Sequence, residues 1–252
     1  MPVQKIIKNM KLKVTLFFLA CLLMPFALKA QDPKLTEDWS LKPLVIQSGK
    51  RMKAPSDAII LFKKRKDISN WTNRKGEPAG WKTGCRKMTT SKTGDVISSQ
   101  AFGDCQLHIE WKTPRKVVGD GQGRGNSGIY FQTLYEVQVL DSYENETYYN
   151  GQAGAIYKQS SPLVNASRKP GKWQYYDVVF RAPRFNEDGS LKSPAVLTVF
   201  HNGVIIQDHF ELKGPSVYGG YPKYTPHEEK KPLLLQDHGN PVSYRNIWIR
   251  EL

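Results

Sequence analysis

Apolar residues in this chain recur in runs of strand length or alternate with polar residues at every second position. Ten such runs follow one another from residue 58 onward, separated by clusters of Gly, Pro, Asn and Asp. They are residues 58–62, 95–102, 106–111, 127–132, 135–141, 154–158, 175–182, 195–212, 233–236 and 246–252. No run keeps the period of an amphipathic helix. The pattern therefore predicts an all-β fold, and this number of strands suits a two-sheet antiparallel jelly-roll sandwich.

The first thirty residues carry a different pattern. Four lysines precede the apolar run VTLFFLACLLMPFAL, which ends in small residues before Gln31. This order predicts a signal peptide over residues 1–30, because a membrane helix needs about 20 apolar residues. A lipid on Cys21 is the less favoured alternative, since the apolar run continues past it. We expect a periplasmic or secreted protein without a transmembrane span, an N-terminal arm over 31–57 and a jelly-roll domain over 58–252.

Charge and cysteine content limit the possible partners. The formal net charge of the 252 residues is +14, and it falls to +9 without residues 1–30. The lysines are scattered and no nucleic-acid motif accompanies them, so we expect a solvated basic surface and no nucleic-acid partner. Outside the signal peptide, Cys85 and Cys105 could form one disulfide or remain two reduced cysteines. Neither has the spacing of a metal ligand.

Strand alternation identifies candidate functional side chains. The apolar residues of 106–111 leave His108 and Glu110 on the opposite face, and those of 135–139 leave Glu136 and Gln138. Residues Leu234, Gln236 and His238 share a face by the same rule. A sandwich buries its apolar faces, so we expect these polar side chains to point outward. If their strands belong to one curved sheet, they line its concave surface. Ordinary solvent exposure would give the same alternation.

Aromatic residues favour a carbohydrate site over plain exposure, because their flat rings can serve as platforms for sugar rings. The candidates are Tyr130, Tyr143, Tyr148, Tyr149 and Trp248.

The segment QDHGNP, residues 236–241, combines a turn with possible chemistry. Gly239 and Pro241 suffice to turn the chain, which leaves Asp237 and His238 unexplained. Histidine suits proton transfer near neutral pH. The segment therefore predicts a functional His238. His201, by contrast, precedes an Asn-Gly hairpin turn and is predicted to be structural.

The glycine-rich loop 119–128 lacks the order of a phosphate-binding loop and enters a strand. It predicts a loop that packs closely or is mobile.

Six motifs in order resemble the 3-keto-disaccharide hydrolase family, long catalogued as a domain of unknown function. They are GNSGIYFQ, YEVQVLDSY, GQAGAIYKQ, KPGKWQYYDVVFRAP, HNGV and LLLQDHGNPVSYRNIWIREL. The resemblance runs from about Pro55 to Leu252 and implies a concanavalin/glucanase-like jelly roll in an exported bacterial protein of glycan metabolism. Two departures occur. Lys63 and Lys64 replace an Asp-Gly turn, and Gln132 replaces an arginine whose role cannot be carried over.

The resemblance implies cleavage of a glycoside whose C3 hydroxyl is already a ketone, supplied by a sugar 3-dehydrogenase. A base removes the C2 proton, the anomeric group leaves and water adds. Glu136 or His238 is the expected catalytic base, and Arg245 or a bound divalent metal would hold the C3 oxyanion. No cofactor is evident from the sequence. Strict alternation would turn Arg245 into the core unless a bulge intervenes. The expected substrate-binding residues are His108, Glu110, Tyr130, Gln132, Gln138, Asp141, Asp237, Arg245 and Trp248.

Two alternatives to this reaction remain open. A retaining glycoside hydrolase would use Glu136 and Asp141 as a pair of carboxylates, but Gln138 removes the central carboxylate of the usual strand motif. A non-catalytic carbohydrate-binding module would share the same fold, because a fold does not fix a function.

Overall fold

The computed structural model describes residues 32–50 and 52–252. The predicted signal peptide, and with it the prediction of export, lies outside the described residues. The chain divides into one unit that ends at Val45 and a second unit, Ile46–Leu252. The described part of the first unit holds one short 3-10 helix, η1 (Pro33–Thr36). No helix of the described residues is long and apolar enough to cross a membrane.

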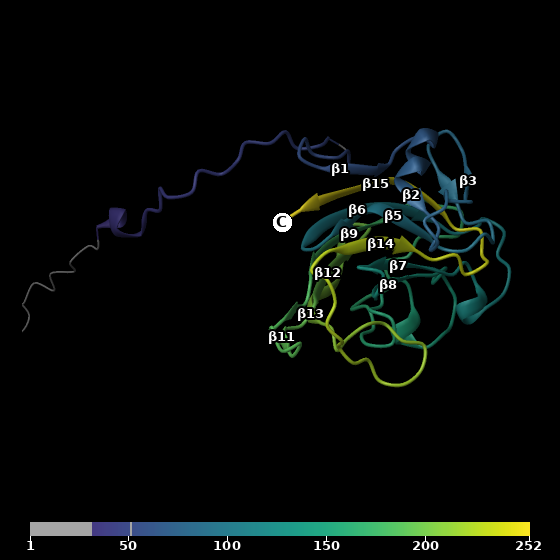
Figure 1. Ribbon diagram of the computed structural model, residues 1–252. Coiled ribbons are helices and arrows are strands. Elements are labelled where there is room, and N and C mark those ends of the chain that lie inside the picture. The colour runs from purple at the N-terminus through teal and green to yellow at the C-terminus, as the bar shows by residue number, and fades with distance from the viewer. Residues whose placement is uncertain (1–31, 51) are drawn as a thin grey trace, which may run out of the picture. The chain divides into compact units, whose positions relative to one another are not determined.

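The second unit contains two antiparallel sheets that lie face to face (Figure 1). The larger, eight-stranded sheet has the order β13-β12-β9-β6-β15-β4-β3, and β1 also pairs with β15. Its strands are β1 (Ile59–Phe62), β3 (Lys82–Thr83), β4 (Met88–Thr89), β6 (Cys105–Lys112), β9 (Gln174–Arg181), β12 (Val196–His201), β13 (Val204–Glu211) and β15 (Ser243–Glu251).

The smaller, five-stranded sheet has the order β2-β5-β14-β7-β8. Its strands are β2 (Trp71–Thr72), β5 (Val96–Phe102), β14 (Lys231–Leu235), β7 (Ser127–Phe131) and β8 (Tyr135–Val139). Outside the sandwich lie the β10–β11 ribbon (Arg184–Phe185, Leu191–Ser193) and the 3-10 helices η2 (Arg65–Asn70), η3 (Gly121–Gly123) and η4 (Tyr149–Gly151). The predicted all-β jelly-roll sandwich is confirmed.

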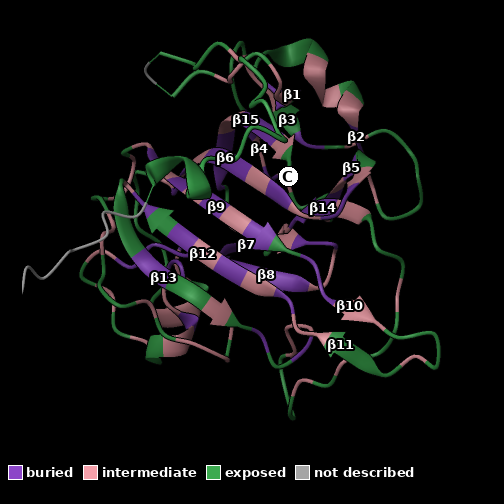
Figure 2. Ribbon diagram, turned by 90° about the vertical axis from the view of Figure 1, so that its left-hand side faces the viewer, coloured by how far each residue is buried: buried purple, intermediate pink, exposed green. Residues whose placement is uncertain are grey.

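The core fills the space between the sheets with side chains from alternate strand positions. Figure 2 shows this alternation along β9 and β12, whereas β8 is buried along its whole length. Phe131 of β7 stacks on Phe180 of β9 with ring centroids 4.9 Å apart. The hydroxyl of Tyr244 donates to Ser127 Oγ across the core at 2.6 Å. Such contacts hold the smaller sheet firmly against the larger one.

The structure decides the predictions made for His201 and for the two cysteines, Cys85 and Cys105. His201 is buried beside Gln174 Oε1, 2.8 Å away, and burial lowers its pKa to about 3, so it is a neutral, structural residue as predicted. Cys85 and Cys105 are both free; Cys85 is exposed and Cys105 is buried in β6.

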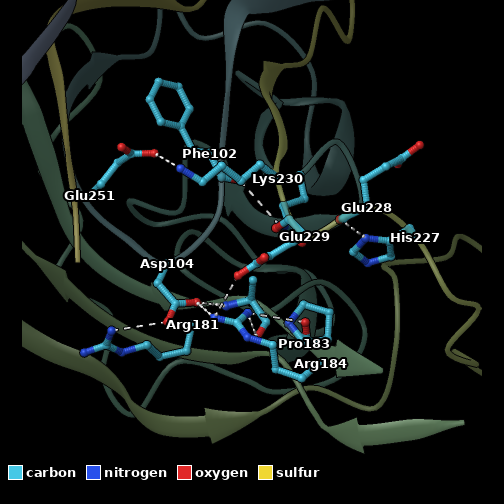
Figure 3. Close-up of polar contacts among 12 residues, drawn as sticks. Phe102, Asp104, Arg181, Pro183, Arg184, His227, Glu228, Glu229, Lys230 and Glu251 are labelled. Atoms are coloured by element: carbon cyan, nitrogen blue, oxygen red, sulfur yellow. Dashed lines mark hydrogen bonds and ion pairs between the residues drawn. The ribbon is translucent and has the colours of Figure 1, made fainter. Parts of the chain in front are cut away.

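Polar contacts tie the segment before β14 to the edges of both sheets (Figure 3). Lys230 Nζ lies 2.7 Å from Glu251 Oε1, and Arg184 Nη2 lies 3.7 Å from Glu229 Oε1. The side chain of Gln132 takes part, because its Nε2 donates to the carbonyl oxygen of Glu229 at 2.6 Å. Gln132 is buried here and holds the chain, so the substrate-binding role predicted for it has no support in this placement.

Candidate functional site

A cavity of about 280 Å³ lies on the outer face of the five-stranded sheet. Strands β7 and β8 supply its floor, while the loops before β7, after β8, after β13 and after β14 supply its walls. It is lined by Gln122, Asn126, Tyr130, Glu136, Gln138, Tyr148, Tyr157, Lys158, Ser216, Val217, Tyr218, Gln236 and His238. Strand alternation therefore placed Glu136 and Gln138 on the correct face. The fold brings the two predicted catalytic residues, Glu136 and His238, to one cavity.

Gly128 creates the space in which Glu136 lies. In the register of β7 and β8, Tyr130 is opposite Glu136 and Gly128 is opposite Gln138. A Cβ atom on Gly128 would lie 2.3 Å from Glu136 Oε1 and 2.7 Å from Tyr130 Cε2. Only glycine leaves room for the carboxyl group and the tyrosine ring to turn over this position.

Glu136 is a buried carboxyl group with a raised pKa. It is 3% exposed, although the alternation argument expected a solvated position. Burial raises its pKa to about 8; a hydrogen bond from Tyr130 opposes this shift, and the charge of Asp95 adds to it. A carboxylate with such a pKa is an unusually strong base near neutral pH.

Amide groups form the wall next to Glu136. Gln138 Nε2 donates to Gln122 Oε1 at 3.0 Å, and Asn126 Nδ2 donates to the carbonyl oxygen of Gln122 at 2.7 Å. Asn240 Oδ1 accepts from the backbone N–H of Asn126 at 3.0 Å. The glycine-rich loop is thus closely packed, one of the two predicted outcomes, and it contributes Gln122 and Asn126 to the site.

The corner after β14 separates a structural residue from an available one. Asp237 accepts backbone N–H groups from Thr93 and Gly239, each at 3.0 Å. Asp237 therefore shapes the turn, contrary to the argument that the turn leaves it unexplained. His238 is exposed at the cavity rim and forms no hydrogen bond with any described residue. Its imidazole is free to meet a ligand.

Four other predicted residues lie on the other sheet. His108 and Glu110 belong to β6, and Arg245 and Trp248 belong to its neighbour β15. The condition that all these strands share one curved sheet is not met, because sequence parity fixes the face of a strand but not the sheet that it joins.

These residues form a polar cluster on the outer face of the eight-stranded sheet. Asn246 adopts a left-handed φ of 46°, and the register shifts there, so the bulge required to turn Arg245 outward is present. Arg245 Nε lies 2.6 Å from Glu110 Oε2, and Trp248 stacks on His108 with centroids 5.3 Å apart. Burial alone would raise the pKa of Glu110, but the His108 imidazole 3.9 Å away and hydrogen bonds from Asn246 and Arg245 lower it to about 2.

The fold separates Asp141 from Glu136. Asp141 follows β8 and its Oδ2 accepts from Arg124 Nε at 2.8 Å. It lines a different cavity together with Arg124, Asn240 and Pro241. Within the lining of the Glu136 cavity, Glu136 is the one carboxylate. Among residues 32–50 and 52–252, no group of three or more His, Cys, Asp or Glu residues could hold a metal ion.

The sequence argument missed the residues that the loops bring to the cavity. Tyr157 and Lys158 lie in the run 154–158, which was predicted as a strand but forms turns next to an isolated bridge at Ile156, and the segment 216–218 lies in a Gly- and Pro-rich stretch. Ser216 reaches the site because its Oγ accepts the backbone N–H of Glu136 at 2.9 Å. The motif GQAGAIYKQ was the signal that could have included Tyr157 and Lys158.

Comparison with known proteins adds a family to this geometry. A crystal structure of a candidate glycosyl hydrolase from Parabacteroides distasonis ATCC 8503, at 2.13 Å resolution, is 46% identical, with a TM-score of 0.84 over 88% of this chain and 97% of that chain. Another candidate glycosyl hydrolase from that organism, at 1.70 Å resolution, is 19% identical, with a TM-score of 0.57 over 78% and 94% of the two chains. The second likeness concerns the fold alone. No curated protein matches.

The family comparison covers most of the second unit. The model of a family described as the 3-keto-alpha-glucoside-1,2-lyase-like domain matches residues 57–250. Together with the 46% identical structure, this match supports a carbohydrate-active function. The chain belongs to the 3-keto-alpha-glucoside-1,2-lyase-like domain family.

Proposed function

We propose that this protein is an exported enzyme that cleaves 3-keto-glycosides by elimination across C1 and C2 of the sugar, followed by addition of water. The observation that carries the proposal is Glu136, one buried carboxylate with a pKa raised to about 8 at the floor of a sugar-sized cavity. The family description, a 1,2-lyase acting on 3-keto-alpha-glucosides, points to the same pair of carbons.

The first step is proton abstraction. A ketone at C3 acidifies the proton on C2, and the Glu136 carboxylate removes that proton while the electron pair moves toward the C3 oxygen. His238 lies on the β14 side of the cavity, across β7 from Glu136, where it can donate a hydrogen bond to the enolate oxygen. Tyr130 beside Glu136 holds the carboxyl group in place.

The second step expels the leaving group. The enolate electrons form the C1–C2 double bond, the bond between C1 and the glycosidic oxygen breaks, and protonated Glu136 returns its proton to that oxygen. Addition of water to the double bond, with Glu136 again as base, yields the free 3-keto sugar. Every proton is accounted for with one carboxyl group, so the reaction suits a cavity with one carboxylate in its lining.

The rival reaction, retaining glycoside hydrolysis, requires two carboxyl groups about 5–5.5 Å apart. Glu136 has no such partner in the lining, and the candidate partner, Asp141, is ion-paired with Arg124. The proposed substrate is a glycoside oxidised at C3, which a sugar 3-dehydrogenase would have to supply.

Paired substrates test the proposal. The purified protein is incubated with p-nitrophenyl glucoside and with its 3-keto derivative, in both anomeric forms, and release of nitrophenol is followed. We expect release from a 3-keto substrate only. In Glu136→Gln, turnover should fall by about 10²–10⁴, and His238→Asn should also lower it.

The matched control is Glu211→Gln, at an exposed position of β13 that should leave turnover unchanged. Equal release from the plain and oxidised glycosides, or full activity in Glu136→Gln, would refute the reaction. Binding of both glycosides without release would favour the carbohydrate-binding module.

A further inference from the structure

A second cavity, of about 440 Å³, adjoins the Glu136 cavity. Tyr148, Lys158 and Tyr218 line both cavities, so the two lie side by side. The proposed reaction on a sugar ring above Glu136 uses only the first. The second lies where a group attached to that sugar would extend.

Lys158 lies at the junction, where its ammonium group donates a hydrogen bond to the carbonyl oxygen of Tyr218 and is surrounded by aromatic rings. Its Nζ is 4.2 Å from the ring centroid of Tyr218 and 5.7 Å from those of Tyr148 and Tyr157. The backbone at Lys158 has a left-handed φ of 57°, and its N–H donates to the carbonyl oxygen of Asn150 at 2.8 Å. A non-glycine residue held in this region is unusual and often marks a functional site.

The far wall of the second cavity presents further flat rings. Tyr218 is 84% exposed and Tyr221 is 98% exposed, and two glycines lie between them. Gln159 anchors the start of this loop, since its Nε2 donates to the carbonyl oxygen of Gly214 at 2.9 Å and its Oε1 accepts the N–H of Lys213 at 2.8 Å. Exposed tyrosines on an anchored loop can stack against a ring-shaped ligand.

The charge of the second cavity is positive and uncompensated. Lys158 and Lys213 line it, and its lining contains no Asp or Glu. Neither lysine forms an ion pair with any residue in the described part of the chain. A negatively charged group would supply the missing partner.

We propose that the second cavity is a leaving-group subsite that selects a ring-shaped, negatively charged group linked to C1 of the sugar. The orientation rests on the proposed function, because that function places C2 at Glu136 and the C3 oxygen at His238, which leaves C1 on the side of Glu136 away from His238, toward Lys158. The anionic ring could be an aromatic acid or a uronic acid, since both combine a carboxylate with a ring face that can stack on a tyrosine. Lys158 and Lys213 form ion pairs with the carboxylate, and the tyrosines stack on the ring.

Calorimetric binding of unoxidised glycosides tests the subsite without relying on turnover. The probes are 4-carboxyphenyl glucoside and its neutral counterpart, 4-carbamoylphenyl glucoside. The wild type should bind the carboxylate more tightly. Lys158→Gln and Lys213→Gln should each reduce the affinity ratio by about two- to fivefold, as expected for a partly exposed ion pair. Added salt should reduce the ratio in the wild type as well.

Two control variants separate charge from shape. Lys192→Gln, at an exposed position of β11 outside this cavity, should leave the ratio unchanged. Tyr221→Ala should weaken both probes by a similar factor, about two- to tenfold. A glucosyl-glucuronic acid disaccharide is compared with its neutral glucosyl-glucose counterpart as a second pair of probes. Tighter binding of the charged member in the phenyl pair identifies an aromatic acid, and in the disaccharide pair a uronic acid.

Equal affinity for the charged and neutral member of every pair, or no measurable binding of either, would overturn the subsite. A charge ratio that Lys158→Gln and Lys213→Gln leave unchanged would overturn it too. If the wild type fails to cleave any 3-keto-glucoside yet keeps a lysine-dependent charge preference, the reaction is wrong and the anionic subsite stands.

Discussion

Glu136 owes its strength as a base to the burial that also makes its charged form unfavourable. The raised pKa means that the neutral carboxyl group is the form best suited to the folded protein. A substrate whose C2 proton can be taken up by this group turns an unfavourable buried charge into a neutral acid. Glu136 is therefore a strong base once it is ionised, and its ionised fraction grows as the pH rises through about 8.

Gly128→Ala should remove activity while keeping the fold. The new methyl group would meet the carboxyl oxygen of Glu136 and the ring of Tyr130, which are side-chain atoms and not backbone. We expect the carboxyl group to be displaced and turnover of a 3-keto-glucoside to fall by about 10²-fold, because small misplacements of reacting groups are expensive. Turnover and the far-ultraviolet circular dichroism spectrum check this.

Gly123→Ala is the matched control, since a Cβ at Gly123 would have no heavy atom within 4 Å. This variant should retain activity. Wild-type turnover in Gly128→Ala would show that the position of the carboxyl group does not matter for the reaction.

At the scale of elements, β6 and β15 carry a cluster that we expect to stabilise the sheet. Glu110 receives hydrogen bonds from Arg245 and Asn246 at 2.6 and 2.8 Å, across the bulge of β15. Glu110→Gln would remove the negative charge to which Arg245 and Asn246 both donate. We expect a loss of about 1–3 kcal/mol in the free energy of unfolding at neutral pH, with KM for a 3-keto-glucoside unchanged.

The lowered pKa of Glu110 fixes the direction in which this stabilisation changes with pH. The pKa of Glu110 falls from 4.5 in the unfolded chain to about 2 in the folded one, so its stabilising effect is present above pH 4.5 and is lost as the pH falls toward 2. The difference between wild type and Glu110→Gln in urea unfolding should therefore shrink in acid. A raised KM with unchanged stability would instead show that Glu110 binds the substrate.

Local pattern predicted the faces of the strands and could not predict their sheets. The parity of Glu136, Gln138, Gln236 and His238 is correct because it depends only on the backbone of each strand. The assignment of β6 to a separate sheet depends on pairing with β9 and β15, far away in the chain. Lys158 and Tyr218 reach the cavity on loops, and hydrophobic periodicity does not predict where a loop lies.

For the whole molecule, activity and stability should move in opposite directions with pH. The pKa of Glu136 rises from 4.5 in the unfolded chain to about 8 in the folded protein, so the folded state retains a proton that the unfolded state has released. Its contribution to stability is complete below pH 4.5 and is lost as the pH rises through about 8. The active carboxylate appears over that same upper range.

Two measurements between about pH 5 and about pH 9 check this expectation. The value of kcat/KM should increase toward pH 8, and the free energy of unfolding of the wild type should decrease relative to that of Glu136→Gln. Activity that falls across this range, or a constant stability difference between the two proteins, would assign the carboxyl group another role.

The C2 proton offers the most direct test of the central claim that Glu136 starts the reaction by removing it. The rate of cleavage of a 3-keto-glucoside is compared between protium and deuterium at C2, and exchange of that hydrogen with solvent is followed. Elimination predicts a slower reaction of the deuterated substrate or exchange of the label before cleavage, with either signal absent in Glu136→Gln. Cleavage by the wild type with equal rates and no exchange would contradict the account.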